Sequence, residues 1–163
     1  GNVALHNTVV KTGHGLWVPH GPGIYYRSTF RNNLAIGGLR DPFRINYSGP
    51  ARGEALFTPE TDPTNDFDYD GIGTHLTPFR GRIGKVEFNS IDELRERTTA
   101  KHAVQVDMSV FENVEFPNPP YPERPVPDLR LKAGSAAVDA GLPLPGINDG
   151  YRGRAPDLGA VAP

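Results

Sequence analysis

Glycine and proline recur along the whole chain and limit the structures that it can form. The sequence contains 19 glycines and 17 prolines among 163 residues. Proline ends or kinks a helix and glycine favours turns, so long helices are excluded over most of the length. We therefore expect many short strands joined by frequent reversals. One domain is expected, because the chain is too short for two ordinary ones.

Charge and cysteine content exclude several functional classes. Lysine and arginine total 17 against 19 for aspartate and glutamate, which gives a formal net charge of -2. This charge offers no electrostatic footprint for DNA, RNA or an anionic membrane, so no nucleic-acid partner is expected. The absence of cysteine excludes disulfides and thiol catalysis. No apolar run approaches the roughly 20 residues that span a bilayer, so no membrane span is expected.

The first residues resemble the middle of a strand. Residues 3–10 are apolar and β-branched and lead into a turn that contains Gly13. The segment lacks the charged-then-apolar order of a signal peptide. We therefore expect a cleaved or truncated N-terminus whose edge pairs with preceding β-helix coils or with another chain.

A weak internal repeat follows this strand. Residues 6–10 align with residues 32–36 at an offset of 26. Three short strands and their turns need on the order of 22 to 28 residues, so this offset is close to one coil of a β-helix. A third copy is expected at residues 65–69, a further 33 residues along. Asparagine suits coil corners, where it tolerates left-handed backbone angles and can bond to the next coil. This predicts structural roles for Asn7, Asn32 and Asn33.

The repeat and the later sequence divide the chain into four segments. Ser90 is followed three residues later by Glu93, a capping box that predicts a short amphipathic helix near residues 90–98. Alternating strands are expected on either side of it. The expected organisation is β-helix coils at 1–39, an insertion loop at 40–64, further coils with the helix at 65–132, and a capping tail at 133–163.

The tail carries the most specific pattern in the sequence. Residues 128–141 read D-L-R-L-K-A-G-S-A-A-V-D-A-G, and residues 149–160 read D-G-Y-R-G-R-A-P-D-L-G-A. Together they resemble the closing segment of secreted bacterial right-handed parallel β-helix proteins of the pectate-lyase-like superfamily, apart from Ala136, where proline is common. The resemblance implies an all-β right-handed parallel β-helix, represented by its last coils, with one short helix and an irregular C-terminal cap.

The tail residues also suggest how the cap is held. An open end of stacked strands exposes unpaired backbone groups and apolar side chains, so the terminal segment must cover it. Asp139, Asp157 and Arg154 are expected to tie the tail loops together by charge-assisted hydrogen bonds. The side chains expected to plug the end are Leu129, Leu131, Val138 and Leu158.

Three alternating aspartates form a candidate metal site. Asp66, Asp68 and Asp70 precede Gly71 in a D-x-D-x-D-G pattern that matches the start of a calcium loop. The closing glutamate of an EF-hand is missing, because Thr77 stands near its position. Calcium is therefore the candidate cofactor. The alternative is a solvent-facing strand or a turn, since alternation places the three carboxylates on one side.

A second cluster suggests contact with a sugar. His14, Trp17 and His20 lie close together, and Trp17 is the only tryptophan. Histidine can act as an acid or base near neutral pH, and an exposed tryptophan offers a platform for a sugar ring. The spacing does not match a zinc site. Carbohydrate binding by these residues and packing of Trp17 under the loop both remain open.

The resemblance implies a carbohydrate-active role. We expect a C-terminal segment that completes and caps a larger secreted or cell-surface polysaccharide-degrading or polysaccharide-binding protein, with catalysis in upstream coils. If the protein is an enzyme, a polysaccharide lyase or glycoside hydrolase is expected, although the sequence singles out no catalytic residue. The alternative is a non-catalytic surface or self-assembling structural protein.

Overall fold

The computed structural model shows short strands and, among the residues that it describes, one α-helix. It describes residues 1–11, 13–17, 26–38, 53–58, 61–117, 123, 125 and 127–160, with the backbone alone at 17 and 57. The expected insertion loop at 40–64 lies largely outside these residues. The elements in chain order are β1 (Val3–Leu5), β2 (Thr8–Val10), β3 (Leu16–Trp17), β4 (Thr29–Arg31), β5 (Leu34–Gly37), β6 (Leu56–Thr58), β7 (Asp66–Phe67), β8 (Gly71–Thr74), β9 (Gly81–Ile83), β10 (Val86–Phe88), α1 (Ile91–Arg97), β11 (Val104–Val106), the 3-10 helix η1 (Met108–Val110), β12 (Phe111–Asn113) and β13 (Asp128–Leu131).

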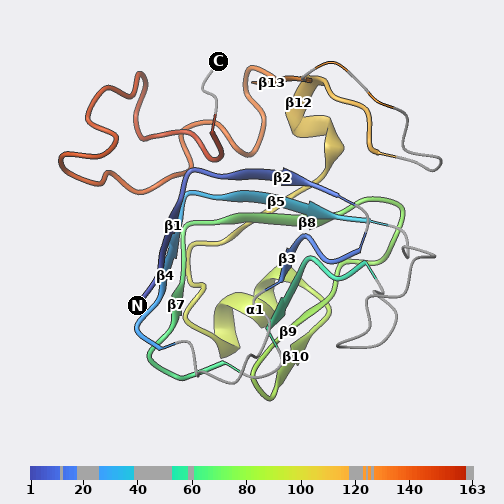
Figure 1. The fold of residues 1–163 in the computed structure, drawn as a ribbon, viewed down its shortest axis with the longest axis vertical. Helices are drawn as coiled ribbons and strands as arrows, with labels where there is room; N and C mark the ends of the chain where they lie inside the picture. Colours follow the sequence, from blue (N-terminus) through green and yellow to red (C-terminus); the bar gives the residue numbers. More distant parts are fainter. Residues whose placement is uncertain are drawn as a thin grey trace.

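Three sheets are built by strands from successive stretches of the chain (Figure 1). Sheet A has the order β1-β4-β7, sheet B the order β11-β8-β5-β2, and sheet C the order β10-β9-β6-β3. Sheets A and B are parallel throughout, and Val3 pairs with Thr29 while Thr8 pairs with Leu34. These pairs confirm the predicted offset of 26 residues.

The next layer has a different spacing from the one predicted. Asp66 pairs with Thr29 and Gly71 pairs with Leu34, so this layer lies 37 residues along. Tyr69 therefore occupies the corner equivalent to Asn32, and both residues have a positive φ, of 55° and 57°. The expected third copy at residues 65–69 is therefore wrong in register, because residues 69–73 are the ones aligned with 32–36.

The predicted fold class, an all-β right-handed parallel β-helix, is wrong. The described strands are two to four residues long and form separate sheets of two to four strands. Two strand pairs, β9 with β10 and β12 with β13, are antiparallel. Gly84, with a φ of 57°, permits the tight reversal that folds β10 back onto β9. Across the described part of the chain, the sheets do not form a β-helix solenoid.

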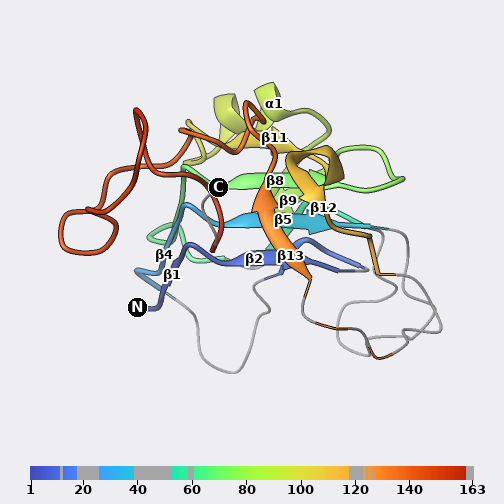
Figure 2. The same ribbon diagram turned by 90° about the horizontal axis from the view of Figure 1, so that it is seen from above.

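One apolar core lies among the three sheets. Phe30 of β4 stacks on Phe67 of β7 with ring centroids 4.5 Å apart. Leu94 of α1 is fully buried in the same cluster. The predicted capping box positions this helix, because the Ser90 hydroxyl accepts the Glu93 N–H at 3.2 Å. Figure 2 shows α1 on the side of the molecule opposite β1 and β2, so the helix covers the core at that end.

The C-terminal segment covers the outer face of sheet B (Figure 1). Leu34 and Ile36 of β5 form one buried cluster with Leu131 and Leu158. The tail leucines therefore pack on a sheet face, whereas the sequence analysis placed them at the end of the strand stack.

The charged residues of the tail hold its loops together as predicted. The Asp157 carboxylate accepts the Asp139 N–H at 2.7 Å, and the Asp139 carboxylate accepts the Arg154 N–H at 2.9 Å. These bonds confirm the expected ties between the tail loops.

Candidate functional site

Among the residues that the structure describes, three strands at one end of the molecule pair on one side only. Strands β1, β2 and β3 each stand at one end of the strand order of their sheet. Together we call them the open edge. Figure 2 places β1 and β2 at the end opposite α1. An edge strand is a template for pairing with another chain, and proteins usually protect such strands with charges, prolines or bulges. The open edge contains neither a charged residue nor a proline.

The backbone of β2 presents hydrogen-bonding groups on the open side. The Asn7 carbonyl accepts the Leu34 N–H at 2.8 Å, and the Lys11 N–H donates to the Ile36 carbonyl at 3.1 Å. In a parallel pair, residues that bond to the neighbouring strand alternate with residues whose backbone groups point away. Residues 7, 9 and 11 therefore face β5, and residues 8 and 10 direct their N–H and carbonyl groups outward.

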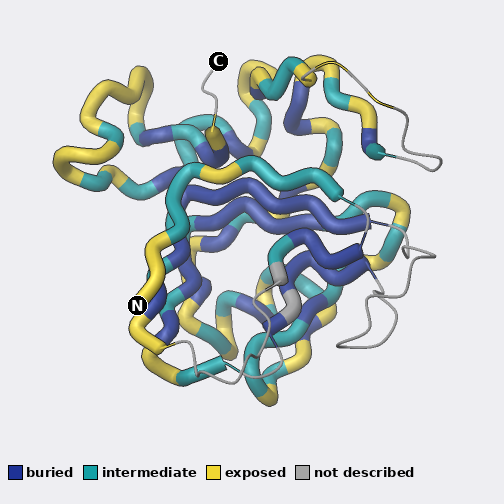
Figure 3. The backbone as a smooth tube through the Cα atoms, in the orientation of Figure 1, coloured by how far each residue is buried: buried dark blue, intermediate teal, exposed yellow. Residues whose placement is uncertain are grey.

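Burial changes sharply between the open edge and the next layer (Figure 3). The residues of β5 are all buried, with Leu34 and Ile36 at 0 % exposure, whereas those of β2 are all half-buried. Val3 of β1 is 70 % exposed. Apolar side chains at the edge therefore remain in contact with water that a further strand would displace.

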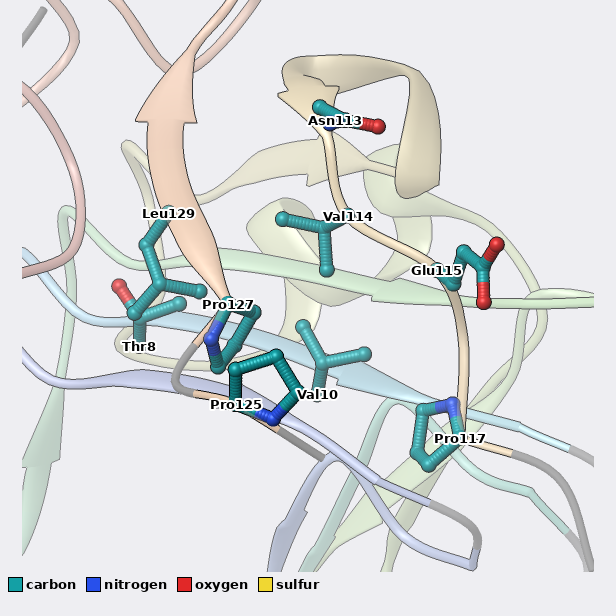
Figure 4. A pocket seen from close by; sticks show the side chains of 9 residues that line it. All are labelled: Thr8, Val10, Asn113, Val114, Glu115, Pro117, Pro125, Pro127 and Leu129. Atoms are coloured by element: carbon teal, nitrogen blue, oxygen red, sulfur yellow. The ribbon is translucent and has the colours of Figure 1, made fainter. Parts of the chain in front are cut away.

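An apolar groove runs beside β2 (Figure 4). Its volume is about 610 Å³. Thr8 and Val10 of β2 form one wall, and Val114 and Leu129 lie across from them. The remaining lining includes Asn113, Glu115, Pro117, Pro125 and Pro127. Because Thr8 and Val10 are aligned with Leu34 and Ile36 of β5, the groove continues the packed layer between sheet B and the C-terminal segment.

A ladder of side chains connects the corners next to sheet B. Asp70 Oδ1 accepts the Asn33 N–H at 2.8 Å and the Asn33 Nδ2–H at 2.9 Å. Asn33 Oδ1 in turn accepts the Asn7 N–H at 3.1 Å and the Asn7 Nδ2–H at 2.8 Å. Asn32 has a left-handed φ of 57°. These contacts confirm the predicted corner roles of the three asparagines.

The predicted calcium residues each have a different partner. Asp66 pairs with Arg31, and Asp70 bonds to Asn33. Asp68 bonds to His102. Among the residues that the structure describes, no group of three or more acidic, histidine or cysteine side chains is arranged to hold a metal. Calcium binding by Asp66, Asp68 and Asp70 stays a prediction.

Asp68 and His102 form a pair that the sequence analysis missed. Asp68 Oδ2 lies 2.8 Å from His102 Nδ1, and Asp68 Oδ1 accepts the backbone N–H groups of Tyr69 and His102. The His102 ring also stacks on the Tyr69 ring, with centroids 4.2 Å apart. A carboxylate on Nδ1 fixes the orientation of the imidazole. The contacts also tie the turn after α1 to the corner before β8.

The predicted sugar-binding cluster is only partly described. His14 is buried, at 5 % exposure, and its Nδ1 lies 2.7 Å from Glu54 Oε2. The backbone of Trp17 belongs to β3 at the open edge, and its side chain is outside the described structure. His20 also lies outside the described residues. The carbohydrate-binding role of His14, Trp17 and His20 stays a prediction.

A second concave site, which we call the tail cup, lies where the C-terminal tail meets β1. Its volume is about 480 Å³. Tyr151 and Ile147 lie at the cup and are 39 % and 61 % exposed. His6 is held there by Asn148, whose Nδ2 lies 2.9 Å from His6 Nε2. Asp157 adds a carboxylate to the lining. The mixture of apolar and polar groups suits a small polar ligand.

Comparison with known proteins assigns no function. No protein-family model, curated protein or solved structure matches the chain. Within the described ranges, no helix is long and apolar enough to cross a membrane. The open edge, the groove and the tail cup are therefore the features of the molecule that can indicate a function.

Proposed function

We propose that this protein is a non-catalytic assembly module that binds an extended segment of another polypeptide as an additional strand beside β2. One observation carries the proposal. Thr8 and Val10 direct their backbone groups toward the open side of β2, and the side chains of the same two residues line the apolar groove.

Strand addition uses both features at once. Backbone hydrogen bonds from an added strand give affinity, and pockets for alternate side chains give selectivity. Every second side chain of a strand beside β2 would enter the groove between Val10 and Leu129. The proline residues at the groove lack N–H donors, so they cannot donate hydrogen bonds to the carbonyl groups of the added strand. The geometry thus supports docking of an apolar strand.

A peptide can test this proposal directly. The probe is a fluorescent peptide of residues 31–37, Arg-Asn-Asn-Leu-Ala-Ile-Gly, because this segment is the natural neighbour of β2. Anisotropy titration of the whole protein is expected to show saturable binding. A Val10→Lys substitution places an ammonium group in the apolar groove and should weaken binding by about tenfold or more.

Two further variants make the peptide result specific. Leu129→Lys alters the opposite wall and should weaken binding to a similar extent. Leu76→Lys is the matched control, because Leu76 is 71 % exposed and does not line the groove. Circular dichroism would show that each variant is folded. Equal binding by all four proteins, or no saturable binding by the wild type, would refute docking at the groove.

Carbohydrate binding is the second candidate function, and the tail cup is its candidate site. Tyr151 offers an exposed aromatic ring beside Asp157 and Asn148, which provide acceptors and donors for sugar hydroxyls. We expect Tyr151→Ala to reduce retention on a polysaccharide array by about tenfold. Tyr26→Ala is the control, since Tyr26 is 56 % exposed and is not part of the cup lining. Unchanged retention after the Tyr151 substitution would exclude the cup as a sugar site.

A further inference from the structure

We infer that Asn7 selects which strand can dock at the open edge: a parallel strand that begins with an asparagine. This inference rests on the proposed function and names the chemistry of the partner. The partner is a segment of a different polypeptide whose asparagine donates two hydrogen bonds to Asn7 Oδ1.

The ladder consists of two steps, which we call rungs, each formed by two hydrogen bonds between successive layers. These rungs define the hydrogen bonds that a further rung would require. At each rung, one side-chain oxygen accepts both the backbone N–H and the side-chain N–H of an asparagine in the preceding layer. Asp70 receives these two bonds from Asn33 at 2.8 and 2.9 Å. Asn33 receives them from Asn7 at 3.1 and 2.8 Å. The same chemistry is therefore used twice at successive layers.

Asn7 is the last residue of the ladder, and its Oδ1 atom can accept further hydrogen bonds. Its Nδ2 donates to Asn33 Oδ1 and to the Leu5 carbonyl at 3.2 Å. Among the described residues, nothing donates to Asn7 Oδ1, and the side chain is exposed. This oxygen stands at the same point in its layer as the Oδ1 atoms of Asn33 and Asp70.

A partner asparagine that donates to Asn7 Oδ1 would also set the register of the docked strand. In both existing layers, the residue after the rung residue pairs with Thr8 or Leu34, and the third residue after it pairs with Val10 or Ile36. An asparagine opposite Asn7 would therefore bring its first and third following residues into the groove. The residue before each rung, His6, Asn32 or Tyr69, has a positive φ. Asparagine or glycine is thus favoured before the partner's rung residue.

The polarity of the ladder argues against a second copy of this chain as the occupant. Every rung bond is donated by the earlier layer and accepted by the later one. Two copies that met at their open edges would bring one Asn7 Oδ1 acceptor toward the other. Their β2 strands would also run antiparallel about a twofold axis, whereas the two-bond rung occurs here between parallel strands.

Three versions of the peptide of residues 31–37 test the inference. The first has the natural sequence, and the others carry Asn33→Ala or Asn33→Asp. We expect the natural peptide to bind the whole protein about tenfold more tightly than either variant, because alanine lacks the side-chain donor and aspartate adds a charged acceptor. With the Asn7→Ala protein, the natural and alanine peptides should differ in affinity by less than about twofold. The reason is that this protein lacks the Asn7 side chain with which the peptide's asparagine interacts.

Each other outcome has a distinct meaning. Equal binding of all three peptides would overturn the role of Asn7 and leave strand docking intact. Absence of binding by every peptide would overturn strand docking and the inference with it. Sedimentation of the protein alone as a dimer that Asn7→Ala dissociates would identify a second copy as the occupant and overturn the choice of partner.

Discussion

Replacing Asn33 with alanine is expected to lower the free energy of unfolding by about 3 kcal/mol. The Asn33 side chain is buried, at 4 % exposure, and makes hydrogen bonds to Ala4, Asn7 and Asp70. Truncation removes the amide that donates to the half-buried Ala4 carbonyl and to the buried Asp70 carboxyl, so both groups lose a partner where access to water is limited. A urea titration followed by circular dichroism would measure the loss as a lower midpoint at unchanged slope.

Asn7→Ala is the matched control for this prediction. It removes the same type of side chain from the same ladder, but Asn7 is exposed and its backbone N–H can still donate to Asn33 Oδ1 after the substitution. Its cost should remain below about 1 kcal/mol. If the two substitutions reduced stability equally, burial of the ladder would not be the source of its contribution.

The second large effect is a fall in stability as pH rises, caused by Asp70. Burial raises the pKa of this carboxyl from 3.8 to about 7, against the opposing effects of the Asn33 hydrogen bonds and Arg31; the neighbouring Asp68 adds a smaller upward contribution. Asp70 Oδ2 is also buried and has no hydrogen-bond partner within the described structure. Between pH 3.8 and about 7, Asp70 is therefore protonated in the folded state and ionised in the unfolded state.

The direction of the pH effect follows from this difference in pKa. The stabilising contribution of protonated Asp70 is fully present below pH 3.8 and is lost as pH rises through about 7. We expect the free energy of unfolding to decrease by roughly 4 kcal/mol between pH 4 and 8 from this group. Urea midpoints at a series of pH values would measure the decrease.

Asp70→Asn separates this effect from other titrations. The amide keeps the Oδ1 acceptor for Asn33 and carries no charge, so the ladder continues as three asparagines. The difference in stability between variant and wild type should therefore grow in favour of the variant from pH 4 to 8. A pH-independent difference would show that Asp70 does not titrate in this range.

Local chemistry was the part of the structure that could be predicted from the sequence. The Ser90 capping box identified α1, and the offset between residues 6–10 and 32–36 gave the pairing of β2 with β5. The corner roles of Asn7 and Asn33 followed from the known tolerance of asparagine for turns. These features depend on a few neighbouring residues or on one short repeat, so they can be predicted without knowledge of the whole fold.

Features that depend on distant segments were missed or misjudged. The tail motif implied a β-helix, but the antiparallel reversal at Gly84 and the separate sheets do not follow that pattern. The pair Asp68 and His102 joins residues 34 positions apart, and no repeat or spacing connects them. The groove combines side chains of β2 with those near β12 and β13, which come together only when the C-terminal segment folds over sheet B.

Because α1 and the turn after it cover the end opposite the open edge in sheet A, a strand added to that sheet could pair only beside β1. Leu94 is fully buried there, and the Thr99 hydroxyl accepts the N–H of Phe67 in the last strand of sheet A. In sheet B, the far edge strand β11 pairs with β8 alone among the described residues. The protein would therefore keep a second strand edge after a segment had docked beside β2.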